Sequence, residues 1–285
     1  MTYVRIGEFQ ANAVDMMVDV KPMEAFKPRP LGRMNFLLGY LAEVKPDIVS
    51  DFATALNTKL QGLVTGDLAD SFGIDVDEVY ADASHLQPYT ELARNHLNYY
   101  LQVLDLPEDG DVWGSVKVTI RNEILSHHLW MYYALEILID LLGRDEAVKL
   151  FKQYITHYLI EMKKGREDRV ENLEALLDNR LKAGLYPGQM MTVGMMADGK
   201  YACKIETCLL KDSMEEIEDI ELKYLVCCYG DYQMVKFSNQ HFILTMEHTI
   251  IEGDDYCSRV IHDTRADWDL RHPPKEFWDA MEANN

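Results

Sequence analysis

The sequence has 285 residues, of which 48% are hydrophobic and 27% charged, so it can bury a sizeable core and is not disordered throughout. Its net charge is −20 and its pI is near 4.8, which makes nucleic acids and anionic membrane surfaces poor partners. Neither a run of about 18 apolar residues nor a signal peptide is present, and we expect a cytoplasmic protein.

The N-terminal 45 residues contain several prolines, which fix φ and remove a backbone donor. This pattern predicts an arm that wraps the body of the protein or a partner subunit, and the second case implies a homo-oligomer. After the arm, apolar residues recur at helical spacing. They predict helices over residues 46–63, 89–104, 113–142, 145–162 and 168–183.

The hydrophobic pattern changes its period after residue 184. Strands are expected over residues 190–197 and 201–210, joined by Asp198-Gly199, which is a strong hairpin signal. A helix over residues 212–229 follows, and strands over 241–251 and 256–262 complete the pattern. The order predicts an α+β fold, in which an N-terminal helical part packs on one face of a four-stranded antiparallel sheet.

The same pattern suggests three parts of the chain. Residues 1–110 are an arm and helical region of unknown role, residues 111–264 form the α+β domain, and residues 265–285 form a tail with a surface helix. No internal repeat or low-complexity segment interrupts this division.

All five cysteines lie in one segment of the chain, and residues 1–202 contain none. In a chain of this size they are read as reduced thiols rather than as a disulfide framework. Thiols are competent nucleophiles and metal ligands, but free cysteine also commonly fills a core. Without a C-x-x-C pair or an H-E-x-x-H motif, the spacing does not indicate a structural zinc site. The five are Cys203, Cys208, Cys227, Cys228 and Cys257.

Three other polar groups have both a functional and a structural interpretation. Glu123 and His127 lie one helical turn apart, as an acid–base or metal site requires and as a simple helix pair also would. Asp254-Asp255 offers paired carboxylates, although acidic residues are common in glycine-containing turns. His248 falls on the apolar face of its expected strand, where a core histidine competes with a base.

Three common motifs are absent from the sequence, namely G-x-G-x-x-G, G-x-x-x-x-G-K-[ST] and G-x-S-x-G. Their absence argues against dinucleotide, P-loop and α/β-hydrolase chemistry.

The segment LVCCYGDYQMVKFSNQHFILTMEHTIIEGDDYCSRVIHD contains C-x-x-D, then an asparagine, a strand with a threonine, and G-D-x-x-C. In this respect it resembles the C-terminal signature of the L-2-amino-thiazoline-4-carboxylic acid hydrolase family. The resemblance covers roughly residues 115–263 and is sharp from Cys228 onward. The matching residues are Cys228, Asp231, Asn239, Thr245, Gly253, Asp254 and Cys257, and Cys208 is similar to a further cysteine of such sequences.

The resemblance implies a hydrolase that opens a small cyclic amidine or a related C–N bond. It supplies positions, to which residue chemistry assigns roles: Asp231 and Asp254 as acid–base or orienting groups, and Cys228 and Cys257 as nucleophiles or metal ligands. No cofactor is indicated with certainty, and a divalent metal bound by Cys208, Cys228 and Cys257 is left open. The residues expected to bind substrate are Arg259, Asn239, Thr245, His248 and Gly253.

Arg259 is a departure from the family pattern, which tends to have an aromatic residue two positions after the last cysteine. It shares a strand face with Cys257, and a guanidinium there would anchor a substrate carboxylate. Equally, the departure is compatible with a different substrate or with loss of the activity.

Two alternatives from other functional classes remain open. One is a non-catalytic sensor or carrier, in which the cysteines bind a metal or a small molecule. The helices-plus-sheet pattern resembles ligand-binding domains of the 4-vinyl-reductase type, and this supports that alternative. The other is a structural subunit whose N-terminal arm is exchanged between protomers.

Overall fold

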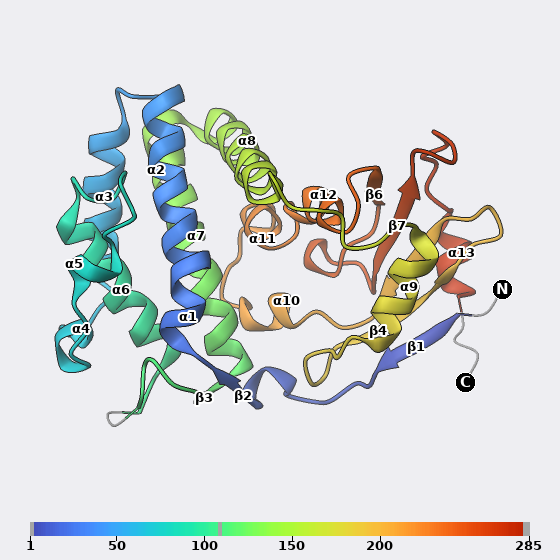
Figure 1. Cartoon of the computed structure of the whole chain (residues 1–285), viewed down its shortest axis with the longest axis horizontal. Helices are drawn as coiled ribbons and strands as arrows, with labels where there is room; N and C mark the ends of the chain where they lie inside the picture. Colours follow the sequence, from blue (N-terminus) through green and yellow to red (C-terminus); the bar gives the residue numbers. More distant parts are fainter. Residues whose placement is uncertain (1–2, 108–109, 282–285) are drawn as a thin grey trace. The chain divides into compact units, whose positions relative to one another are not determined.

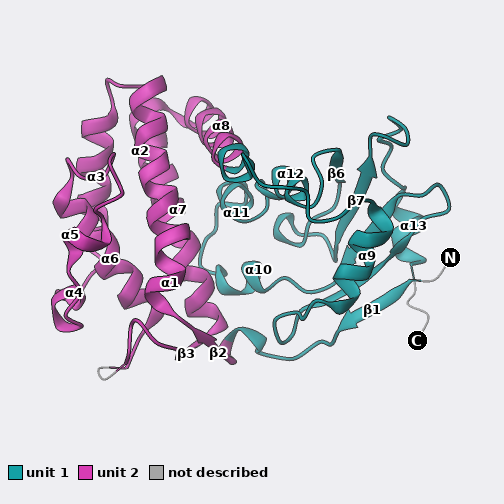
Figure 2. Cartoon of the chain, viewed as in Figure 1, with its two compact units in different colours: residues 1–14, 159–285 teal, residues 15–158 magenta. Residues whose placement is uncertain are grey.

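The computed structural model describes residues 3–107 and 110–281 (Figure 1). The chain forms two compact units: unit 1 comprises residues 1–14 and 159–285, and unit 2 comprises residues 15–158 (Figure 2). These boundaries differ from the three-part division expected from the sequence pattern, which stays a prediction. Within the described residues, no helix is both long and apolar enough to cross a membrane.

Unit 2 is mainly helical and has one short two-stranded sheet. In that sheet β2 (Met17–Val20) pairs antiparallel with β3 (Val116–Thr119). The helix α8 continues into unit 1. The helical elements are α1 (Pro22–Phe26), a π-helical turn η2 (Lys27–Leu31), α2 (Gly32–Val44), α3 (Val49–Gln61), α4 (Leu68–Ser71), α5 (Val76–Val79), α6 (Thr90–Leu104), α7 (Ile120–Leu142) and α8 (Arg144–Lys163).

The first half of the chain differs from the sequence pattern at two places. Residues 1–45, expected to form an arm, contain regular structure, including the 13-residue helix α2, because the prolines precede that helix rather than interrupt it. That this segment wraps the body of the protein or a partner subunit stays a prediction. The expected helix over residues 113–142 begins only at Ile120. Val116 and Val118 are β-branched and form strand β3, and Thr119 caps α7 by accepting a hydrogen bond from the N–H of Asn122 (3.1 Å).

The pair Glu123–His127 lies inside unit 2. The carboxylate Oε1 is 3.4 Å from His127 Nδ1, and both side chains are buried. His128 Nδ1 is hydrogen-bonded to the carbonyl oxygen of Ile124 (2.8 Å), and burial lowers the pKa of His128 to about 3. The neighbouring histidines therefore have separate partners, as the 100° rotation between adjacent helical residues requires.

Unit 1 is built on a five-stranded antiparallel sheet with strand order β1-β4-β5-β7-β6. The predicted α+β fold is confirmed. The four expected strands are present, and β1 is a fifth that the pattern did not reveal, because four residues offer too few alternations to be recognised. The strands are β1 (Val4–Gly7), β4 (Met190–Met195), β5 (Tyr201–Ile205), β6 (Phe242–Met246) and β7 (Cys257–Asp263).

The helical elements of unit 1 are short. The expected helix over residues 212–229 is divided, because Asp219 accepts a hydrogen bond from the N–H of Leu222 (3.2 Å) and starts a new helix there. The elements are η1 (Ala13–Asp15) at the boundary with unit 2, α9 (Leu173–Lys182), α10 (Leu209–Ser213), α11 (Ile220–Cys227), α12 (Asp231–Met234), η3 (Val235–Phe237), η4 (Ile250–Glu252) and α13 (Lys275–Asp279).

Both faces of the sheet are covered within unit 1. On one face, Val193, Cys203 and Leu244 pack with Leu173 of α9. On the other, Ala202 and Val260 pack with Trp278 of α13, which is fully buried. The C-terminal tail contains a helix, as expected. Its Lys275, Glu276 and Asp279 are exposed, and it inserts Trp278 into the core.

Candidate functional site

Arg259 lies near the middle of strand β7, on the face of the sheet that α9 covers. The register pairs it with Cys203 on β5 and with Met246 on β6. Cys257 lies two residues earlier on the same strand and therefore on the same face, because side chains alternate along a strand. We refer to this side of the sheet as the Arg259 face.

Arg259 forms an ion pair with Asp231 through its terminal guanidinium nitrogen and Oδ2. The two side chains are 27% and 28% exposed, so the pair is reachable but partly removed from water. The Nε atom of Arg259 is buried and has no hydrogen-bond partner in the described part of the chain. Asp231 is held in place because its N–H donates to the carbonyl oxygen of Cys228 (2.9 Å).

The charge of this guanidinium acts on several thiols. Its positive charge lowers the pKa of Cys203, Cys208 and Cys228, but burial is the larger effect and raises all three. The charges of Cys208 and Cys257 also raise the pKa of Cys228, so these thiols are within electrostatic range of one another. Cys228, Asp231, Cys257 and Arg259, all expected from the sequence, therefore lie in one region of unit 1.

The adjacent cysteines Cys227 and Cys228 have different surroundings. Cys227 directs its thiol to the sulfur of Met214 (3.2 Å). Cys228 is buried, and the charges of Arg259 and Cys257 both act on it. Of the two, Cys228 is therefore the residue on the side of the Arg259–Asp231 pair.

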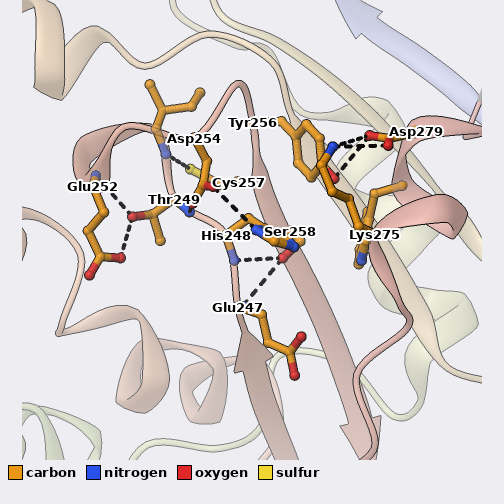
Figure 3. A network of polar contacts seen from close by, with 12 residues as sticks. Glu247, His248, Thr249, Glu252, Asp254, Tyr256, Cys257, Ser258, Lys275 and Asp279 are labelled. Atoms are coloured by element: carbon orange, nitrogen blue, oxygen red, sulfur yellow. Dashed lines mark hydrogen bonds and ion pairs between the residues drawn. The ribbon is translucent and has the colours of Figure 1, made fainter.

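A turn over residues 247–256 connects β6 with β7 (Figure 3). Asp254 holds it together: its Oδ2 accepts the N–H of Thr249 (2.8 Å), and its Oδ1 lies 3.3 Å from His248 Nδ1. Cys257 accepts a hydrogen bond from the N–H of Ile250 (3.4 Å). Gly253 has φ +107°, which only glycine adopts without strain, so its contribution is to the backbone of the turn.

Three expected site residues are placed differently from the sequence pattern. Strand β6 ends at Met246, so His248 lies in the turn rather than on an apolar strand face. Thr245 lies on the opposite side of the sheet and contacts two histidines there. Asn239 is buried, and its amide donates to the carbonyl oxygens of Val170 (3.0 Å) and Glu171 (3.1 Å). Since both amide hydrogens are used, Asn239 joins two loops.

Cys208 is the N-cap of α10, and its sulfur accepts the N–H of Lys211 (3.4 Å). Across the residues that the structure describes, no group of three or more His, Cys, Asp or Glu side chains could hold a metal ion. Cys208, Cys228 and Cys257 are within electrostatic range of one another but are not arranged as ligands of one ion.

The sequence reasoning missed Cys203 and a polar group behind the sheet formed by Ser258, His262 and His272. Cys203 could have been found from strand pairing, since it is directly opposite Arg259. Ser258 and His262 could have been grouped by their alternation with Cys257 and Arg259. No sequence signal connects His272 with them.

The comparison with protein families matches the part of the chain that contains these residues. Residues 123–260 match the family described as L-2-amino-thiazoline-4-carboxylic acid hydrolase, which confirms the predicted resemblance. The match begins in α7 and ends in β7, and it includes the Arg259–Asp231 pair. The searches of curated proteins and of solved structures gave no match.

The thiol of Cys257 is expected to react slowly with alkylating agents. Burial raises its pKa to about 12, and only the thiolate is nucleophilic. At pH 7 the rate with iodoacetamide should be roughly 1,000-fold below that of free cysteine, and it should rise about tenfold per pH unit. Mass spectrometry of the Cys257 peptide measures this rate, with urea-unfolded protein as the control. A rate independent of pH between 7 and 9 would contradict the raised pKa.

Proposed function

We propose that the protein is a hydrolase that opens a small cyclic amidine or a related C–N bond, and that its substrate binds at the Arg259–Asp231 pair. The observation that carries the proposal is this partly exposed ion pair on the thiol-lined Arg259 face. The family match supports the hydrolytic class, and the residues support the kind of substrate.

An arginine beside an aspartate is complementary to a zwitterion. A cyclic amidine that carries a carboxylate has a negative group and, when protonated, a positive amidinium. The Arg259 guanidinium suits the carboxylate, because its planar fork binds two oxygens at once. The Asp231 carboxylate suits the amidinium in the same way. Such a substrate replaces one ion pair by two, so neither protein charge is left without a partner.

The reaction requires a base for water and a proton for the departing nitrogen. Water attacks the carbon between the heteroatoms, and Asp231 accepts the proton that water releases. The bond from this carbon to the ring nitrogen then breaks, the nitrogen takes the electron pair, and the proton on Asp231 passes to it. The hydroxyl that came from water forms the product C=O, and its remaining proton returns to the Asp231 carboxylate and then to solvent. Asp254 acts as an orienting group, since its carboxylate is engaged with the N–H of Thr249 and with His248.

The thiols are assigned to substrate contact rather than to nucleophilic attack. Because burial raises the pKa of Cys257 to about 12, only about one molecule in 10⁵ carries its thiolate at pH 7. The pKa of Cys228 is raised as well. Neutral thiols beside the ion pair suit a heterocycle with a polarisable atom such as sulfur. Direct attack by water is therefore favoured over a covalent intermediate.

The test is an assay of the purified full-length chain on three compounds: 2-aminothiazoline-4-carboxylate, 2-aminothiazoline without the carboxylate, and a five-membered lactam carboxylate. Ring opening is expected for the first compound, with much lower kcat/KM for the second. One oxygen atom from ¹⁸O-labelled water should enter the product. The proposal fails if all three compounds stay unchanged with and without added Zn²⁺ or Mn²⁺.

The raised thiol pKa values also favour a second function, a non-catalytic small-molecule sensor or carrier, because such a site needs no reactive nucleophile. Calorimetry separates the two functions. Binding of the amidine carboxylate without turnover would support the sensor, whereas binding followed by ring opening supports the hydrolase. Loss of binding in Arg259→Met is expected in both cases.

A further inference from the structure

Four polar side chains form a hydrogen-bonded chain on the side of the sheet opposite the Arg259 face. His262 Nε2 lies 2.9 Å from Thr245 Oγ1, which lies 3.0 Å from His272 Nδ1. His272 Nε2 in turn lies 2.9 Å from Ser258 Oγ. Ser258 is completely buried, and the chain joins β6 and β7 to the segment that precedes α13.

The direction of the first hydrogen bond follows from the contacts of Ser258. Its Oγ accepts the N–H of His248 (3.0 Å) and the N–H of Glu247 (3.3 Å), as Figure 3 shows. A hydroxyl oxygen has two lone pairs and one hydrogen. Because both lone pairs are occupied by backbone donors, the hydroxyl hydrogen points to His272, and His272 Nε2 is the acceptor.

The remaining directions follow from the neutrality of His272. Burial lowers its pKa to about 4; the charges of His248 and His262 lower it further and Glu247 raises it. The neutral ring carries its hydrogen on Nδ1, which therefore donates to Thr245. Thr245 then donates its own hydrogen to His262 Nε2, which is the second hydrogen-bond partner of its hydroxyl among the described residues. Two backbone amides thus fix one tautomer of His272.

The chain of side chains ends at the turn of the candidate site. Glu247 and His248 are the first residues of the 247–256 turn, which contains Asp254 and leads directly into Cys257. The backbone N–H of Ser258 also donates a hydrogen bond to the carbonyl oxygen of His248 (3.0 Å). This serine therefore determines where the turn begins, and His272 determines the orientation of its hydroxyl.

We propose that His272 is a positioning residue, which fixes the Ser258 hydroxyl on the amides of Glu247 and His248 and so holds the turn that carries Asp254 and Cys257. The consequence for catalysis rests on the proposed function, but the positioning itself does not. His272 is stacked on Trp278, with ring centroids 5.3 Å apart. His272 lies beyond residue 260, where the family match ends, so the proposed positioning residue is outside that match.

The first test is hydrogen–deuterium exchange of the Glu247 and His248 amides in three variants of the full-length chain. His272→Phe keeps an aromatic ring against Trp278 but removes the acceptor, and both amides should exchange at least tenfold faster. In His272→Gln the side chain can still accept from Ser258 and donate to Thr245, so exchange should stay within threefold of wild type. His241→Phe, at an exposed position, is the matched control. Unchanged exchange in His272→Phe would overturn the proposal.

The second test uses the wild-type protein, so its result cannot be affected by a substitution that disturbs the fold. Nitrogen-15 NMR of the wild-type histidines at pH 7 should show His272 with its hydrogen on Nδ1 and an unprotonated Nε2. The opposite tautomer would overturn the proposal. Neither measurement uses a substrate, so failure of the hydrolase proposal and failure of this one are distinguishable. If the chain is a hydrolase, His272→Phe should lower kcat at least threefold and His272→Gln should restore it.

Discussion

Replacing Arg259 by methionine is expected to lower kcat/KM for a carboxylate-bearing cyclic amidine by at least about 100-fold. The variant removes the anchor for the substrate carboxylate and leaves Asp231 without its partner. Loss of one member of a partly buried charged pair typically costs about 2–5 kcal/mol, and about 2.7 kcal/mol corresponds to 100-fold. Steady-state kinetics on the purified variant measures the effect.

Arg259→Lys separates geometry from charge. Lysine keeps the positive charge but loses the planar fork, so an intermediate loss of about 10-fold, mainly in KM, is expected. A compound without the carboxylate should respond little to either change. Arg265→Met, which removes an ion pair with Asp263 just beyond the end of the same strand, is the matched control and should keep its activity. Full activity of Arg259→Met would contradict the assignment of the anchor.

Replacing Trp278 by alanine is expected to destabilise unit 1 by about 3–5 kcal/mol, the usual cost of removing a large buried aromatic side chain. Trp278 is fully buried against Val260 and Ala202 of the sheet, and its indole N–H donates to the carbonyl oxygen of Pro273 (3.2 Å). Its backbone carbonyl oxygen also accepts a hydrogen bond from Lys204 Nζ (2.8 Å). Denaturant unfolding monitored by circular dichroism measures the loss.

Trp268→Ala is the control for this experiment, because Trp268 lies in the same C-terminal segment and is 72% exposed. Its replacement should change the free energy of unfolding by less than about 0.5 kcal/mol. Equal effects of the two substitutions would show that the segment does not contribute its tryptophan to the core as the structure indicates.

Sequence periodicity was sufficient for the elements that are long or that have a clear turn. The helix over residues 89–104 and the hairpin around Asp198-Gly199 are both present within a few residues of the predicted bounds. Periodicity failed where elements are short, as in β1 and β3, because four residues do not distinguish a strand from an irregular segment. It also failed at Asp219, where a cap divides one expected helix into two.

The candidate site was partly predictable for the same reason. Alternation along β7 places Cys257 and Arg259 on one face without any knowledge of the tertiary structure. The family signature indicated Cys228 and Asp231 as well. It also grouped Thr245 and Asn239 with them, although Thr245 lies behind the sheet and the Asn239 amide is engaged with backbone carbonyls. Proximity in the sequence does not specify the face of a sheet when strand ends are uncertain.

The sequence by itself determined the α+β class, the concentration of thiols in one segment, and the shared strand face of Cys257 and Arg259. All three follow from local spacing. The tertiary structure decided that Asp231 is the partner of Arg259 and that Cys228, rather than Cys227, lies beside them. It also decided that His272 reaches Ser258. Such contacts depend on how distant segments fold back on the sheet, and the positions of those segments are set by packing rather than by spacing along the chain.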